Sequence, residues 1–246
     1  MKLFYTTLLY CTSLFFMSCE ADKIVVDDII SRVTFSKTEL VANGSDTSTI
    51  TVYFRKEISK DKVMLDVEVD NGVFIESEEG GNSLKDISPE RNIDNELFVE
   101  INLKSTTINA PHNIEFKVGQ FTKNENVQSS KSTPASISIT SSSFSVQNNF
   151  ESEIELEGII LNENGAKVSN GTKVIFSDFY ADGSPVNGSF RNIKNTSNSE
   201  SKVSALYSPG IIVPNQFITL MVTVLDENNS STNIQASIEI YVNEGD

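Results

Sequence analysis

The sequence predicts an all-β chain made of two antiparallel β-sandwiches in tandem. Three observations predict this fold class. Short segments alternate apolar with polar residues, no window shows the 3.6-residue apolar period of a helix, and clusters of turn-forming residues separate the segments. At 246 residues the chain is long enough for two domains of ordinary size.

Residues 1–18 have the pattern of a cleaved signal peptide. Lys2 gives a positive start, and residues 3–17 are mostly apolar but too few to span a bilayer comfortably. The segment Phe16-Met17-Ser18-Cys19 resembles the lipobox of bacterial lipoproteins, with a bulky apolar residue three positions before the cysteine. The resemblance implies that Cys19 begins the mature chain and carries the lipid. The alternative is an ordinary secretory signal in which Cys19 is incidental.

Residues 19–30 are expected to form a lipidated tether. The segment Cys19-Glu20-Ala21-Asp22-Lys23 is polar and acidic. It resembles the export signal of surface lipoproteins in Bacteroidetes-type Gram-negative bacteria. The resemblance implies an outer-membrane protein, anchored to the membrane through Cys19 and exposed at the cell surface. A tether that is merely solvated is the alternative.

The first domain is predicted over residues 31–123. Apolar residues occupy every second position in the segments 50–54, 63–69, 97–103 and 114–118. Such alternation is typical of antiparallel strands with one buried and one wet face. Residues 124–135 are rich in Asn, Ser, Lys and Pro with few apolar residues, so we expect a linker there.

The second domain is predicted over residues 136–243. Alternation returns in the segments 154–160, 174–176, 203–207, 218–224 and 234–242. The turn cluster at 226–231 predicts that the last two of these strands form a hairpin. Two units of about 100 residues, each with about seven short strands, are the pattern expected of immunoglobulin-like sandwiches.

Residues 162–176 resemble the bacterial Ig-like domains of the invasin and intimin group. The positions that fit are glycines at turns followed by apolar strand residues: Gly165, Val168, Gly171, Val174 and Phe176. Residues 40–52 of the first domain resemble the opening segment of the same group. The resemblance implies that the two domains act as stiff spacers and adhesion modules.

The composition excludes several classes of function. Lys and Arg number 19 against 34 Asp and Glu, a net charge of −15, which argues against nucleic acid and anionic lipid headgroups as partners. Of the two cysteines, Cys11 lies in the predicted signal peptide, so we expect neither a disulfide nor a cysteine metal site in the mature domains. We also expect no cofactor. The absence of Trp argues against a flat sugar-binding platform.

Candidate catalytic and metal-binding groups each have a simpler interpretation. The single histidine, His112, lacks the partners of a zinc site or a catalytic triad, so we interpret it as a turn residue. Acidic residues alternate over 151–157, which suggests either a divalent cation site or a solvated strand face. Asp27-Asp28 and residues 226–228 are further acidic pairs where a cation could stiffen tandem domains.

One loop stands out as a possible ligand-binding site. Asp178, Phe179, Tyr180 and Asp182 place two aromatic rings beside turn residues, and loops often carry binding residues. The alternative is a hydrophobic plug that closes one end of a sandwich.

The sequence therefore predicts a non-enzymatic, lipid-anchored envelope protein that acts in surface adhesion or as a binding or spacer module. Its ligand is a protein or a glycan, which the residues do not distinguish. The alternatives are a periplasm-facing scaffold subunit of an envelope complex and a carbohydrate-binding accessory lipoprotein.

Overall fold

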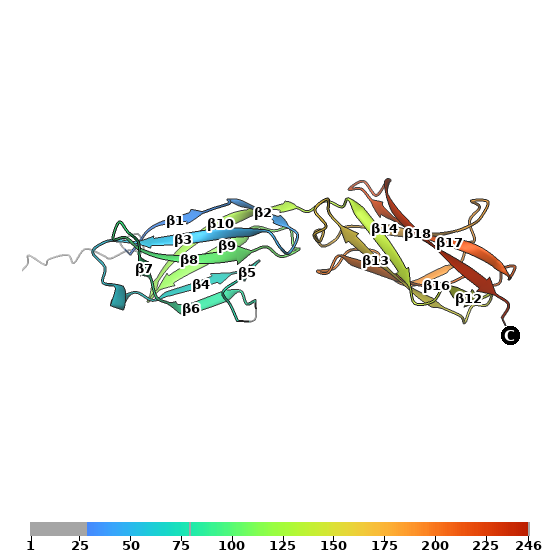
Figure 1. Ribbon diagram of the computed structural model, residues 1–246, viewed down its shortest axis with the longest axis horizontal. Coiled ribbons are helices and arrows are strands. Elements are labelled where there is room, and N and C mark those ends of the chain that lie inside the picture. Colours follow the sequence, from blue (N-terminus) through green and yellow to red (C-terminus); the bar gives the residue numbers. More distant parts are fainter. Residues whose placement is uncertain (1–28, 79, 246) are drawn as a thin grey trace, which may run out of the picture.

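The computed structural model describes residues 29–78 and 80–245. These residues form four β-sheets, which pack in pairs as two β-sandwiches arranged end to end (Figure 1). The predicted fold class is thus confirmed. No helix in the described ranges is long and apolar enough to cross a membrane. The predicted signal peptide 1–18, the predicted lipid-bearing Cys19 and tether residues 20–28 lie outside the described residues.

Two sheets form the first domain. One has the order β1 (Ile30–Phe35), β3 (Thr47–Phe54), β8 (Leu97–Lys104), β5 (Val73–Phe74), with β7 (Glu90–Arg91) also paired to β8. The other has the order β2 (Glu39–Ala42), β10 (Phe121–Lys131), β9 (His112–Val118), β4 (Leu65–Val69), β6 (Ser83–Ile87). A short 3-10 helix, η2 (Lys60–Lys62), precedes β4.

The second domain has the same two-layer plan. One sheet has the order β11 (Ser136–Ser141), β13 (Ile154–Leu161), β16 (Lys202–Ser208), β15 (Ser189–Lys194). The other has the order β12 (Ser145–Gln147), β18 (Ser231–Asn243), β17 (Gln216–Leu225), β14 (Val174–Tyr180). As predicted, β17 and β18 form a hairpin through residues 226–230, where Asp226 caps the turn by accepting the backbone N–H groups of Asn228 and Ser230.

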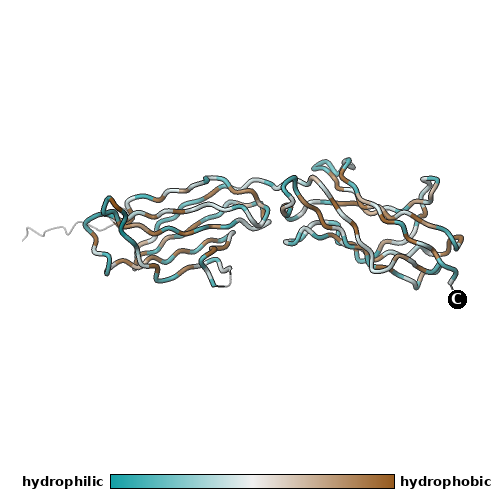
Figure 2. Tube along the Cα trace, in the orientation of Figure 1, coloured by the Kyte–Doolittle hydropathy of each residue, from teal (hydrophilic) through white to brown (hydrophobic). Residues whose placement is uncertain are grey.

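The predicted alternation places the cores correctly. In β3, β8 and β17, every second residue is buried between the two sheets of its own domain, and the same period is visible as alternating colour along the chain (Figure 2). The last strand, β18, is less regular than predicted. Only Ile240 and Val242 are fully buried there, whereas Ile234, Ala236 and Ile238 are partly buried against the core.

The predicted linker over residues 124–135 is largely a strand. β10 continues to Lys131, pairing with β9 and, in parallel, with β2. The polar composition misled the prediction because most β10 side chains face solvent, and Val127 alone is fully buried there. The connection between the domains is therefore short: only residues 132–135 separate β10 from β11.

A buried polar pair secures the core of the second domain. The hydroxyl of Tyr207, which is fully buried, donates to the Asp178 carboxylate at 2.9 Å, and the Gly188 N–H donates to the same oxygen at 2.7 Å. Burial raises the pKa of Tyr207 above its ordinary value, and the adjacent carboxylate raises it further. Gly188 is required here, because an added Cβ would lie 2.6 Å from the Tyr207 hydroxyl oxygen.

Replacing Tyr207 with Phe should destabilise the second domain by about 1–3 kcal/mol, because the buried Asp178 carboxylate loses one of its donors. Urea unfolding followed by circular dichroism measures this change, with the first domain as internal reference. Tyr241→Phe is the matched control, since the Tyr241 hydroxyl makes only a 3.3 Å hydrogen bond at the surface. Equal stability of the two variants would contradict this role of the Tyr207 hydroxyl.

Candidate functional site

The two domains are joined by direct hydrogen bonds. The hydroxyl of Ser169, in the second domain, donates to the carbonyl of Ala42 at the end of β2 at 3.0 Å. Beside it, the Asn170 N–H donates to the Thr107 carbonyl at 2.8 Å, and the Thr107 hydroxyl donates back to Asn170 Oδ1 at 2.7 Å. A reciprocal pair of this kind fixes both the distance and the rotation between its two segments.

The connecting segment belongs to the same network, which we call the joint. The Ser132 N–H donates to Ser169 Oγ at 2.9 Å, and the Ser169 N–H donates to the Ser132 carbonyl at 3.2 Å. Ser132 and Ser169 are both buried. Since buried polar groups that lose their partners are costly, the domains have little freedom to bend at this point.

The segment that resembles bacterial Ig-like domains builds the second-domain side of the joint. Gly171 has a φ of +83°, which glycine adopts without strain, and its N–H donates to the Ser197 carbonyl at 3.0 Å. This turn brings Ser169 and Asn170 to the end of the domain. The exposed Lys131–Glu227 ion pair also bridges the two sides, at 3.1 Å, but such pairs contribute little to stability.

The predicted ligand-binding loop does not form a single site. Asp178, Phe179 and Tyr180 belong to β14 rather than to a loop, with Asp178 pointing into the core and Tyr180 packed against it. Asp182 lies on the exposed turn, where it accepts the backbone N–H and the hydroxyl of Ser184 at 2.9 and 2.6 Å. These hydrogen bonds lower the pKa of Asp182. Of the four, Phe179 faces outward from the sheet.

The other candidate groups are structural. His112 is the first residue of β9 and is fully buried, with its Nδ1 bonded to the Asn71 carbonyl, so it is not a turn residue. In the acidic row, Glu153 pairs with Arg191, and Glu157 pairs with Lys202 at 3.3 Å. Within the described residues, no group of three or more His, Cys, Asp or Glu side chains could hold a metal ion.

One sheet face of the second domain combines aromatic and aliphatic side chains with small uncharged polar ones and carries almost no charge. The outward side chains of β14, β17 and β18 lie in four cross-strand rungs: Phe217–Tyr241, Phe179–Thr219–Glu239, Ser177–Met221–Ser237 and Ile175–Thr223–Gln235. We call these residues the outer face. Phe217 is 56% exposed and Ile175 is 49% exposed. The rings of Phe217 and Tyr241 contact each other with centroids 5.0 Å apart.

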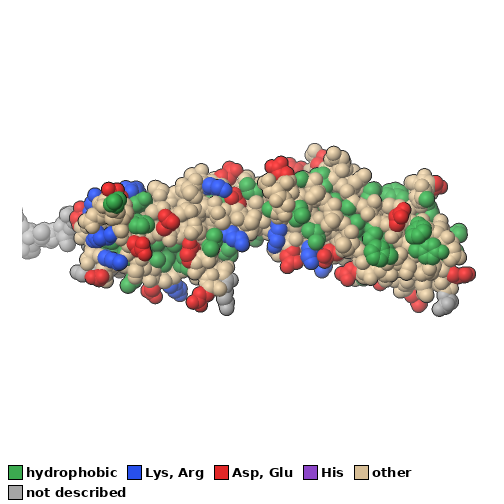
Figure 3. Space-filling view, viewed as in Figure 1, with side chains coloured by type: hydrophobic (Ala, Val, Ile, Leu, Met, Phe, Trp, Pro, Cys, Tyr) green, Lys and Arg blue, Asp and Glu red, His purple; other side chains and the backbone are tan. Residues whose placement is uncertain are grey.

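The outer face has little charge compared with the other three sheets. Glu239 is its one ionisable carboxylate, and residues 203–225 contain no Asp, Glu, Lys or Arg. In contrast, each of the other sheets directs charged side chains outward, for example Glu100 from β8, Lys117 from β9 and Glu155 from β13. In Figure 3, hydrophobic side chains gather on the second domain with little charged surface between them.

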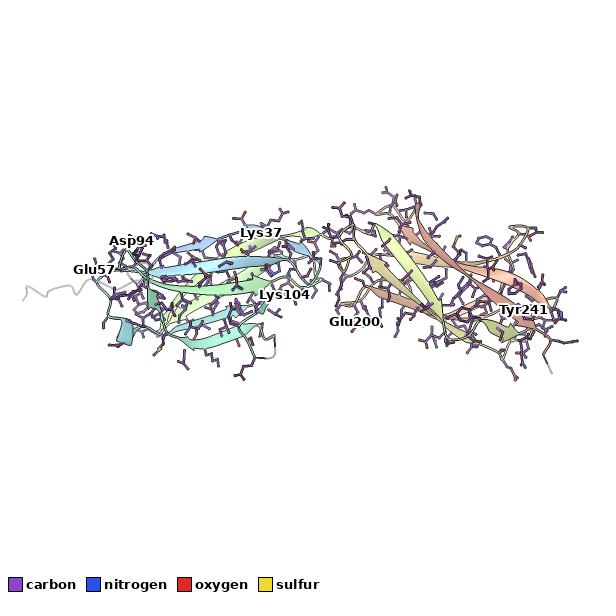
Figure 4. All side chains as sticks on the ribbon, in the orientation of Figure 1. Lys37, Glu57, Asp94, Lys104, Glu200 and Tyr241 are labelled. Atoms are coloured by element: carbon purple, nitrogen blue, oxygen red, sulfur yellow. The ribbon has the colours of Figure 1, made fainter. Side chains whose placement is uncertain are left out.

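The aromatic rung lies at the end of the molecule farthest from the first described residues. Figure 4 shows Tyr241 near the C-terminal end, with Glu57 and Asp94 at the opposite end. Phe144 adjoins the rung, because its carbonyl accepts the Tyr241 N–H at 2.9 Å, and its side chain is 70% exposed. Sequence analysis missed this site, although the apolar residues Phe217 and Met221 at outward positions of a predicted strand are a usable signal.

No protein-family profile and no curated protein matches the sequence significantly. Among solved structures, invasin, described as a bacterial integrin-binding protein, gives a TM-score of 0.57 at 11% identity over 87% of this chain. The adhesin InvE of Yersinia pseudotuberculosis gives 0.46 at 14% identity, also over 87% of this chain. This chain spans 39% of the invasin chain and 60% of the InvE chain. The likeness to invasin shows the fold: Ig-like sandwiches in tandem.

Replacing both Ser169 and Asn170 with Ala should loosen the joint without unfolding either domain. The change removes two hydrogen bonds between the domains and one from the Ser132 N–H to Ser169, each worth about 1 kcal/mol. Spin labels at Glu100→Cys and Glu155→Cys, one in each domain, report the distance distribution by electron paramagnetic resonance. We expect a single narrow distribution in the parent and a broadened one in the double variant.

The matched control carries the same two changes at Ser83 and Asn124, which are exposed strand positions of the first domain that make none of the hydrogen bonds of the joint. An equally narrow distribution in the joint variant and the control would contradict the role of these hydrogen bonds.

Proposed function

We propose that this protein is a lipid-anchored adhesion module of the bacterial outer membrane, in which the first domain is a spacer and the second presents the outer face. The observation that carries this proposal is the placement of the two ends. The chain enters the first domain at one end of the molecule, and the aromatic rung lies at the other, beyond the joint (Figures 1 and 4).

The chemistry of both ends supports the proposal. The lipobox-like segment at Cys19 would hold the N-terminal end at a membrane, since several acyl chains bury enough CH₂ groups for stable anchoring. An exposed apolar patch on a soluble domain marks an interaction site. The fold it shares with invasin, described as an integrin-binding protein, is compatible with adhesion.

The orientation of the protein is tested by protease treatment of intact cells. We expect both domains to be shaved from whole cells, because the proposal places them outside the outer membrane. A known periplasmic protein in the same cells is the control and should survive until the membrane is permeabilised. If the two proteins are protected equally, the protein faces the periplasm and acts as a scaffold there.

The anchor is tested separately by Cys19→Ala. We expect the variant to lose metabolic labelling with a fatty acid and to leave the membrane fraction, because Cys19 would be the attachment site. Cys11→Ala is the matched control, since that residue lies in the predicted signal peptide. Persistent lipid labelling of the Cys19 variant would contradict the proposed anchor.

A further inference from the structure

We propose that the outer face binds a second copy of this chain, so that adhesion is homophilic. This inference deepens the proposed function by naming the partner. Two outer faces would pack as one sheet against another around a two-fold axis, with the aromatic rungs at or near the contact.

Of the four outward sheet faces, the outer face is the one on which two copies of this acidic chain would repel each other least. Each copy carries a net charge of −15, so two copies repel each other wherever carboxylates meet across the contact. Salt screens charges more than about 8 Å apart at physiological ionic strength, which leaves the composition of the contact itself as the deciding term. The outer face has a single carboxylate, Glu239, and its other side chains are aromatic, aliphatic, thioether, hydroxyl or amide groups.

The residue types also fit a protein contact. Aromatic residues and Met are enriched at the centres of protein interfaces, whereas charged residues are depleted there. Phe217 and Tyr241 supply a pair of aromatic rings. Met221 lies four residues after Phe217 on β17 and faces the same side of the sheet. A neutral glycan would use the rings and amides but would gain little from Ile175, which is 49% exposed at the other end of the face.

The size of the face predicts weak pairing. Three strands about 4.8 Å apart and rungs about 6.8 Å apart cover roughly 14 Å by 25 Å, or about 350 Å² per copy. Two such faces bury about 700 Å², which is below the roughly 1,200 Å² of stable complexes. We therefore expect a dissociation constant of about 0.1–1 mM. Such pairing is sufficient between surfaces, where many anchored copies bind at once.

The test is sedimentation equilibrium of residues 20–246, which contain every residue of both described cores. We expect a reversible dimer as the concentration approaches about 1 mM. Phe217→Ser with Tyr241→Ser should weaken dimerisation by about tenfold or more. Ile75→Ser with Ile93→Ser is the matched control, because both are exposed apolar residues of the first domain and lie off the face. Circular dichroism verifies that each variant is folded.

Two further measurements address the mechanism. Glu239→Gln should tighten the dimer, since it removes the one carboxylate from each face. Raising the salt concentration from about 0.05 M to about 0.5 M should leave the dimer unchanged or strengthen it, because screening reduces the remaining repulsion. A dimer that dissociates with salt would be held by charge, which would overturn the proposed contact.

Two other outcomes of the sedimentation experiment would overturn the proposal. A chain that stays monomeric up to about 1 mM overturns homophilic pairing, and a dimer that is insensitive to the Phe217 and Tyr241 changes overturns the assignment of the face. These results are independent of the cell-based tests above. A monomer that is nevertheless shaved from cells leaves the adhesion proposal standing, whereas a dimer protected from protease would place the pairing in the periplasm.

Discussion

The packing of two sheets face to face is the constraint on which the rest of this structure depends. The central strands of each domain bury one side against the opposite sheet, so their inward positions must be apolar and their outward positions are free to vary. Residues such as Leu103 and Leu220 therefore explain the fold but say nothing about function. The features that distinguish this chain from other β-sandwiches lie in its outward residues and its domain ends, which core packing does not restrict.

Much of the fold was predictable because the alternation has a physical cause. The inward sets of β3, β8, β13 and β17 follow directly from every second residue being apolar. β10 was predicted as part of a linker because its exposed residues are polar, which is also the composition of a linker. Val127 is its one fully buried residue and its one core signal in the sequence. The pairing of Asp178 with Tyr207 escaped for a different reason: the two residues are brought together by the crossing of two sheets, and no local pattern encodes that.

The candidate site was predicted only in part. Phe179 does contribute to the outer face, but through its place on a strand rather than in a loop, and its neighbours Asp178 and Tyr180 serve the core. The outer face combines residues from three strands that are up to 66 positions apart in the sequence, from Ile175 to Tyr241. Its apolar character appears only once strand register is known. The joint could not be predicted for the same reason. Ser169 and Asn170 have the sequence pattern of ordinary turn residues, and their role depends on contacts with the first domain.

The order of strands has a mechanical consequence for a molecule held at both ends. In each domain an early strand runs parallel to the last: β2 beside β10, and β12 beside β18. Tension along the molecule pulls such a pair in opposite directions along the strand axis, so that all of its hydrogen bonds are loaded together instead of opening one after another. A pull on the N-terminal end of the chain against a load on β18 would therefore be carried in shear by these two pairs. Resistance of this kind depends on the direction of pulling, and it would be lost if the same strands were peeled apart sideways.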